Sequence, residues 1–276
     1  MSEEPKLNIL AYQYPKVLLI FPRLIRIIYI FNYATQLRKI YVMRAWKRLV
    51  KASDKAALIA DFGAGEAQYL VPFCNSYPQK TFYALDNRDS NILFCEALGY
   101  SNLKASLVDL EHNAFKEQAD LGICVGVMQY LENDMAALLN IYQSLKPGAT
   151  LLLYVPINGI ILTAVYKQIL IRWQHYETIN KRKRVYSEDD LLFKLKEAGF
   201  SVQHKTYTYG YFGKLSHEIL NSLSTIIFSG TNLLKIIAVL LFPICFPFII
   251  CFMGIDFILP KTNGNGVLLE LKKGVH

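Results

Sequence analysis

Two glycines stand two residues apart in the run Asp61–Gly65, directly after an apolar stretch. Gly63 and Gly65 would let the backbone bend sharply there and approach a bound ligand closely. Alone, such a turn is weak evidence, because many parallel sheets need one. However, Asp86 ends the next apolar run, where a carboxylate can accept hydrogen bonds from two ribose hydroxyls, and Asp109 follows the third run. Together these residues predict a nucleotide-like ligand.

The elements that must position these residues are short apolar runs alternating with stretches of helical periodicity. The predicted strands are Ala56–Phe62, Thr81–Leu85, Leu103–Val108, Leu121–Val127 and Thr150–Val155, followed by Phe200–Tyr209 and Gly266–Lys273. The predicted helices are Glu66–Phe73, Asp89–Leu98, Asn133–Leu145 and a segment that Ser187 caps and Gly199 ends. This alternation predicts an α/β fold with a parallel sheet covered on both faces, which binds its ligand beyond the carboxyl ends of the strands.

The chain resembles the class I S-adenosylmethionine-dependent methyltransferases over roughly residues 56–200 and the final strand. The family pattern Asp/Glu-x-Gly-x-Gly-x-Gly is matched at Asp61, Gly63 and Gly65, with Ala67 at the last glycine, and Lys146–Ala149 matches the turn before the fifth strand. The resemblance implies a Rossmann-like sheet of seven mostly parallel strands with helices on both faces. It also implies that the last strand is antiparallel and lies between the fifth and sixth.

The resemblance further implies S-adenosylmethionine as cofactor and a set of residues that hold it. The turn would bind the amino-acid part of the cofactor, Asp86 the ribose and Asp109 the adenine amino group. The implied cofactor residues are Asp61, Gly63, Ala64, Gly65, Asp86, Asn87, Asp109, Leu110, Val125 and Gly126. No metal site is predicted, since the five cysteines lack metal-ligand spacing.

Three residues are candidates for proton transfer. Many family members place a histidine shortly after the fourth strand, and Tyr130 occupies that place here. His217 follows the sixth strand and His175 lies in the segment after the fifth, so both could reach the active face. Lone histidines are also often structural. The alternating tyrosines of 207–211 could line a pocket or pack a core.

We expect four parts in the chain. These are basic amphipathic N-terminal helices (1–55), the methyltransferase domain (56–209 and 266–276), an insertion on its active face (157–186) and an apolar helical insertion (210–265). All three additions to the domain would converge around the substrate entrance.

The apolar insertion has a stretch, Ile236–Ile255, that carries no charge and has about the twenty residues needed to cross a bilayer. A single crossing would leave the last strand on the wrong side of the membrane. We therefore expect Ile219–Ile255 to form a helical hairpin, kinked by Pro243 and Pro247, that dips into one leaflet. The alternative is a soluble helical lid whose apolar faces pack on one another.

The net charge of +8 lies entirely in residues 1–55, which hold eleven bases and three acids. Bases between Ala34 and Lys51 recur at helical spacing among apolar residues, which predicts a basic amphipathic helix whose apolar side faces either a membrane or the domain. This interleaving favours an anionic membrane surface as partner, and we expect no nucleic acid. The expected location is cytoplasmic, peripheral or monotopic on the inner membrane face, while the oligomeric state is not predicted.

The composition, 53% hydrophobic and 19% charged, excludes a disordered or fibrous chain. The expected function is methylation of a hydrophobic or amphipathic small molecule at the membrane surface, such as a lipid, a quinone or isoprenoid precursor, or a polyketide-like or aryl-polyene metabolite. O-methylation is the first expectation. The alternatives are a catalytically silent membrane-binding scaffold with the same fold, and an RNA methyltransferase, whose RNA binding would weaken steeply with salt.

Overall fold

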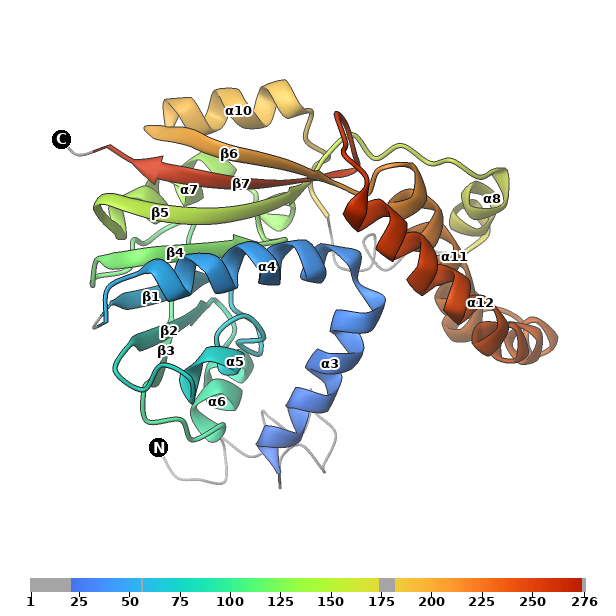
Figure 1. Cartoon of the computed structure of the whole chain (residues 1–276), viewed down its shortest axis with the longest axis horizontal. Coiled ribbons are helices and arrows are strands. Elements are labelled where there is room, and N and C mark those ends of the chain that lie inside the picture. The colour runs from blue at the N-terminus through green and yellow to red at the C-terminus, as the bar shows by residue number, and fades with distance from the viewer. Residues whose placement is uncertain (1–20, 56, 174–181, 275–276) are drawn as a thin grey trace.

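The computed structural model describes residues 21–55, 57–173 and 182–274. They form a seven-stranded sheet of order β3-β2-β1-β4-β5-β7-β6 (Figure 1). The strands are β1 (Leu58–Phe62), β2 (Thr81–Asp86), β3 (Leu103–Leu107), β4 (Ala119–Val125), β5 (Leu145–Pro156), β6 (Phe200–Thr208) and β7 (Gly266–Lys273). The first five pair in parallel, and β7 runs antiparallel between β5 and β6. The predicted Rossmann-like sheet is confirmed.

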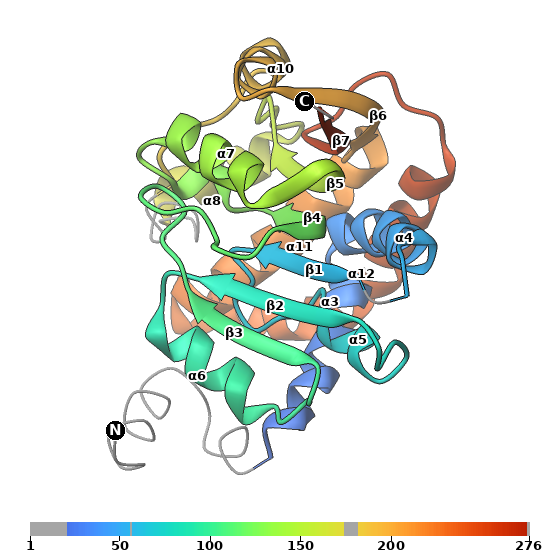
Figure 2. The same ribbon diagram turned by 90° about the vertical axis from the view of Figure 1, so that its left-hand side faces the viewer.

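Helices cover both faces of this sheet. The helices are η1 (Pro22–Leu24), α3 (Ile25–Thr35), α4 (Leu37–Ala52), α5 (Val71–Cys74), α6 (Asp89–Ala97), η2 (Met128–Tyr130), α7 (Asp134–Gln143), α8 (Ala164–Arg172), α10 (Glu188–Glu197), α11 (Tyr211–Ser229) and α12 (Asn232–Ile258). One apolar core joins the sheet to α4, α5 and α6, and a second joins it to α7 and α10. Figure 2 shows α4 and α7 on opposite sides of the strands.

The order in which the strands are added to the sheet reverses between β1 and β4, because β2 and β3 extend to one side of this pair and β5 to the other. Chains leaving β1 and β4 therefore diverge to opposite faces and open a crevice beyond their carboxyl ends. Gly63 follows β1 and Gly126 follows β4 at this point, and both have positive φ angles, 85° and 68°. The topology alone thus places the glycine turn at the ligand-binding edge.

The predicted helix at Glu66–Phe73 is wrong. The chain there makes turns, and helix appears only over the four residues of α5. Gly65 and Ala67 have left-handed φ angles of 53° and 57°, which no right-handed helix accommodates. Pro72, which lacks an amide hydrogen, lies within the first turn of α5. Periodicity of apolar residues did not reveal this constraint.

Helix α4 packs on the sheet by its apolar side. Of the two placements predicted for this side, against a membrane or against the domain, the structure has the second. Val42, Trp46 and Val50 are fully buried in the core, whereas Arg44 and Lys47 are exposed. The prediction of a basic surface is wrong at two positions. Lys39 is 2% exposed, and Arg38 lines an internal cavity described below. Part of the N-terminal charge therefore lies inside the protein.

The apolar insertion is a helical hairpin, as expected, but it begins earlier than Ile219 because α11 starts at Tyr211 directly after β6. Pro243 and Pro247 both lie inside α12. The base of the hairpin is fixed by the buried carboxylate of Asp256, which accepts hydrogen bonds from Gly213 N (2.9 Å) and Tyr41 Oη (3.2 Å). Figure 1 shows the hairpin, α8 and α3 at the same end of the sheet, beyond the carboxyl ends of the parallel strands.

Candidate active site

The glycine turn after β1 lies over the end of β2. The amides of Gly63 and Ala64 both donate to Leu85 O, at 2.8 and 2.9 Å, and Gly65 N donates to Asp86 Oδ2 at 2.9 Å. A Cβ atom at Gly63 would lie 2.3 Å from a methyl group of Val127, so no side chain fits at this position. The structure thus brings the turn, the second-strand acid and the segment after β4 together, as their positions in the sequence predicted.

Asp61, the first residue of the motif, is a buried acid without a partner. It is 1% exposed, and its Oδ2 atom has no hydrogen-bond partner among the described residues. Burial, and then the negative charge of Asp86, raise the pKa of Asp61 well above its ordinary value. A cation placed beside Oδ2 would relieve both effects, so this position suits a positively charged group of a ligand.

Asp86 and Asp109 follow their strands as expected. Asp86 Oδ1 accepts hydrogen bonds from Arg88 N and from Asn91 Nδ2, both at 3.0 Å, which fixes its carboxylate at the edge of the sheet. Asn87 beside it is exposed, and Leu110 after Asp109 is buried. Asp109 Oδ2 forms an ion-pair contact of 3.0 Å with His112 Nδ1.

Val125 ends β4, and Gly126 after it marks the boundary between this turn region and a large cavity. A Cβ atom at Gly126 would lie 3.1 Å from a guanidinium nitrogen of Arg38. Gln129 Nε2 donates to Gly126 O at 2.9 Å, whereas Gln129 Oε1 is buried without a partner among the described residues. The wall of the cavity beside Gly126 is therefore polar, with Arg38 and Gln129 next to the end of β4.

The cavity has a volume of about 1000 Å³, enough for a large ligand. Its walls come from three sources besides the strand ends: the α3–α4 junction, residues of 157–170 and 182–185, and the α11–α12 hairpin. Described residues from all three additions to the domain therefore line one cavity. Polar and charged residues in the wall are Thr35, Gln36, Arg38, Gln129, Tyr130, Tyr154, Tyr166, Arg182, Lys183, Arg184, Tyr209, Lys214, His217, Glu218, Asn221, Ser224 and Asn265.

Two of the three proton-transfer candidates, Tyr130 and His217, line this cavity. His175 lies outside the described residues. The ring of His217 lies edge-on to Tyr209, with centroids 5.3 Å apart, and its Nδ1 is 3.0 Å from Asn221 Nδ2.

Of the alternating tyrosines, only Tyr209 lines the cavity; Tyr207 donates to Glu188, and Tyr211 is exposed. Tyr209 has a left-handed φ of 56°, and its hydroxyl accepts a hydrogen bond from Arg38 N at 3.2 Å. A tyrosine in this conformation is strained, and strain of this kind is found at functional sites.

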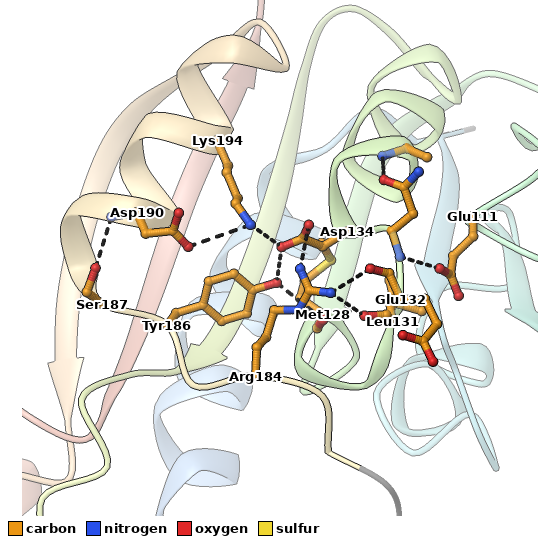
Figure 3. A network of polar contacts seen from close by, with 12 residues as sticks. Glu111, Met128, Leu131, Glu132, Asp134, Arg184, Tyr186, Ser187, Asp190 and Lys194 are labelled. Atoms are coloured by element: carbon orange, nitrogen blue, oxygen red, sulfur yellow. Dashed lines mark hydrogen bonds and ion pairs between the residues drawn. The ribbon is translucent and has the colours of Figure 1, made fainter.

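A buried polar network holds the walls of the cavity in place (Figure 3). Asp134 Oδ2 accepts hydrogen bonds from Tyr186 Oη (2.6 Å) and Lys194 Nζ (2.7 Å), and its Oδ1 pairs with Arg184 (2.7 Å). Arg184 also donates to the carbonyl oxygens of Leu131 and Glu132, which follow η2. The network joins α10 and the segment 182–186 to the turn that carries Tyr130.

Sequence reasoning missed Arg38, Lys214 and Glu218 as cavity residues. Arg38 follows the buried Leu37 at the start of α4, a position that helical spacing alone assigned to the outer face. Lys214 and Glu218 lie one turn apart on α11, on the same side as His217. The expected position of His217 near the active face could therefore have indicated these two residues as well. Among the described residues, no group of three His, Cys, Asp or Glu side chains could hold a metal ion.

Comparison with known proteins agrees with this geometry. Residues 60–153 match the family model described as a methyltransferase domain. No curated protein matches the chain in sequence.

Three similar solved structures share 12–14% identity with the chain. The first is the O-methyltransferase of a trans-AT PKS multienzyme of Brevibacillus brevis, in complex with S-adenosylhomocysteine (14% identity, 84% of this chain and 72% of that chain, TM-score 0.54). The second is coclaurine N-methyltransferase bound to N-methylheliamine and S-adenosylhomocysteine (12% identity, 85% of this chain and 71% of that chain, TM-score 0.54). The third is the (4+2)-cyclase SpnF (13% identity, 84% of this chain and 81% of that chain, TM-score 0.53). At these identities the likeness concerns the fold.

The sheet order, the glycine turn with its two acids and the family match agree with one another. The chain carries a class I S-adenosylmethionine-dependent methyltransferase domain, whose cofactor is S-adenosylmethionine.

Proposed function

We propose that the protein methylates a hydrophobic or amphipathic small molecule at a membrane surface, with O-methylation the first expectation. Lipids, quinone or isoprenoid precursors, and polyketide-like or aryl-polyene metabolites fit this description. The observation that carries the proposal is the cavity of about 1000 Å³, which begins beside Gly126 at the cofactor edge of the sheet and extends beneath the apolar hairpin. It gives a large substrate access to the methyl donor.

The residues at the sheet edge fit the proposed cofactor. S-adenosylmethionine carries an ammonium group, which the Asp61 carboxylate would receive at Oδ2, the oxygen that has no partner among the described residues. Asp86 would hold the ribose, and Asp109 with Leu110 would contact the adenine. Gly63, Ala64 and Gly65 leave space for close approach of the backbone, while Val125 and Gly126 would lie beside the methionine part. The cofactor supplies an electrophilic methyl group on a sulfonium.

The remaining chemistry belongs to the cavity. The bound cofactor would supply its methyl group for an in-line displacement, so the chain must orient a substrate oxygen toward that group and exclude water. A hydroxyl substrate loses its proton in this reaction and benefits from a base. His217 and Tyr130 both line the cavity, and we assign His217 as the first candidate because an imidazole titrates near neutral pH.

Exposed apolar surface on the hairpin supports action at a membrane. Helix α12 (Asn232–Ile258) is long and apolar enough to span a bilayer, and only 17% of its most apolar stretch is buried. Ile236 and Leu240, one turn apart, are 60% and 65% exposed. A lid whose apolar faces pack on one another would bury these side chains. The neighbouring α3 exposes Ile27 and Ile30 as well, so apolar surface surrounds this end of the molecule.

Flotation with vesicles tests the membrane part of the proposal. The wild-type protein is expected to float with vesicles of mixed neutral and anionic lipids, and a double variant Ile236→Glu/Leu240→Glu is expected to stay at the bottom. Phe193→Glu is the matched control, because Phe193 is 62% exposed on α10, away from the hairpin. Wild-type protein that remains soluble without vesicles or detergent and does not float would refute membrane action.

Titration with S-adenosylhomocysteine tests the enzymatic part. Binding is expected, and its absence would favour the silent scaffold. The substrate would be sought by mass spectrometry of lipid and pigment extracts with and without the gene, as a compound that differs by one CH₂ group. Steeply salt-dependent binding of RNA would instead favour the RNA methyltransferase.

A further inference from the structure

The wall of the large cavity is strongly basic. Among the described residues it includes Arg38, Arg182, Lys183, Arg184 and Lys214 but only one acid, Glu218. Cavities that accept neutral apolar compounds have mostly apolar walls with a few polar groups. An excess of positive charge raises the local concentration of anions and favours a ligand that carries negative charge.

Three of the charged residues in the cavity wall, Glu218, Arg184 and Lys183, already have partners. Glu218 accepts three hydrogen bonds, from Leu162 N (2.6 Å), Thr163 N (2.9 Å) and Thr163 Oγ1 (2.6 Å), and thereby holds the start of α8. Arg184 pairs with Asp134, and Lys183 pairs with Glu132. The single acid that the described part of the wall holds is therefore not available to neutralise another base.

Unlike Lys183 and Arg184, Lys214 has no acidic partner among the described residues. It lies in the first turns of α11, lines the cavity and is only 8% exposed. Within the described ranges its ammonium forms no hydrogen bond or ion pair with any other residue. Most of the Lys214 side chain is covered, but its Nζ atom is not fully buried, so the ammonium is open to the cavity and can pair with an anionic group of a ligand. The side chain therefore provides a site for an anionic group.

We propose that Lys214 binds an acidic group, a phosphate or a carboxylate, on an amphipathic substrate. This inference rests on the proposed function and narrows it to anionic amphiphiles. The apolar part of such a substrate would contact Ile161, Leu220 and Phe242, which line the same cavity. Phe242 belongs to α12, whose outer surface is exposed and apolar, so apolar groups lie on both the cavity side and the outer side of this helix.

Calorimetric titration of the full-length protein with four short probes tests the inference: octyl phosphate, octanoate, octanol and inorganic phosphate. The wild-type protein is expected to bind octyl phosphate or octanoate at least about tenfold more tightly than octanol, the gain from one charge-assisted hydrogen bond. Lys214→Met should remove this preference and leave octanol binding unchanged. Lys196→Met, an exposed lysine on α10, is the control with the same change in net charge.

Equal affinity for octyl phosphate, octanoate and octanol would overturn the inference, as would a Lys214→Met variant that keeps the preference. Inorganic phosphate that binds as tightly as octyl phosphate would overturn the proposal that the ligand is an amphiphile, because it would show a site for free anions. Titration with S-adenosylhomocysteine separates these outcomes from failure of the proposed function. Wild-type and Lys214→Met proteins should bind it equally, and wild-type protein that does not bind it would refute the methyltransferase activity itself.

Discussion

Replacement of Asp61 by asparagine should weaken cofactor binding and at the same time stabilise the free protein. The asparagine side chain keeps the shape of the aspartate but removes the charge that would pair with the cofactor ammonium. Loss of a charged hydrogen bond costs about 1.5–3 kcal/mol, which corresponds to about a 10- to 150-fold rise in the Kd for S-adenosylhomocysteine. Calorimetry at pH 7 measures this change directly.

The expected stabilisation follows from the raised pKa of Asp61. The protonated carboxyl is favoured in the folded state, so folding meets no penalty at low pH. As the pH rises from the unfolded pKa of about 3.9 to the folded pKa, the acid ionises in the unfolded chain but stays protonated in the fold, which destabilises the fold by about 1.4 kcal/mol for each unit of the shift. Asp61→Asn avoids this penalty, so its advantage in denaturant unfolding should be largest at neutral pH and disappear near pH 4.

The control for both measurements is Asp189→Asn, which removes the same charge from an exposed position in the first turn of α10. It should leave cofactor affinity at the wild-type value. An Asp61→Asn variant that binds S-adenosylhomocysteine as tightly as the wild-type protein would refute the assignment of Asp61. A variant that is destabilised at pH 7 would refute the view that its carboxylate lacks a partner.

Other substitutions test the remaining parts of the site. Asp86→Ala should raise the Kd for S-adenosylhomocysteine at least about tenfold while circular dichroism shows a folded protein; an unchanged Kd would refute the ribose assignment. Gly63→Ala should destabilise the fold by about 1–2 kcal/mol or more, measured by denaturant unfolding, because of its φ of 85° and the contact with Val127. Burial acts to raise the pKa of Asp134, but hydrogen bonds from Lys194 and Tyr186 prevail and lower it. Its stabilising effect is therefore complete above its ordinary pKa and is lost as the pH falls below about 4, so Asp134→Asn should show a weaker acid dependence of unfolding than the wild-type protein.

The sheet could be predicted because its determinants are local in the sequence. Each of the five parallel strands contains a short apolar run with a turn signal after it, and the resemblance supplied the strand order, including the antiparallel β7. The turns after Gly65 could not be predicted, since Ala67 adopts a left-handed φ that its residue type does not favour. In that segment the contact of the backbone with β2 decides the conformation.

The cofactor edge was accessible from the sequence, whereas the substrate cavity was not. Asp61, Gly63 and Asp86 are placed by the ends of adjacent strands, which the pattern of runs locates. Arg38 and Lys214 reach the cavity because two helices from opposite ends of the chain pack together through Leu37 and Gly213, where a Cβ would lie 2.7 Å from Leu37. Helical spacing shows which residues share a face but not which neighbour that face meets.

The position of β7 in the sheet has a consequence for synthesis of the protein. This strand lies between β5 and β6, yet it follows the whole apolar hairpin in the chain. During translation, α11 and α12 therefore leave the ribosome before the strand that joins β5 to β6 exists. Until Val267–Leu271 are made, two strand edges stay open and the hairpin has no completed sheet beside it. The nascent chain thus exposes its most apolar segment and its unpaired edges together, and binding of that segment to a membrane or a chaperone at this stage would protect it from aggregation.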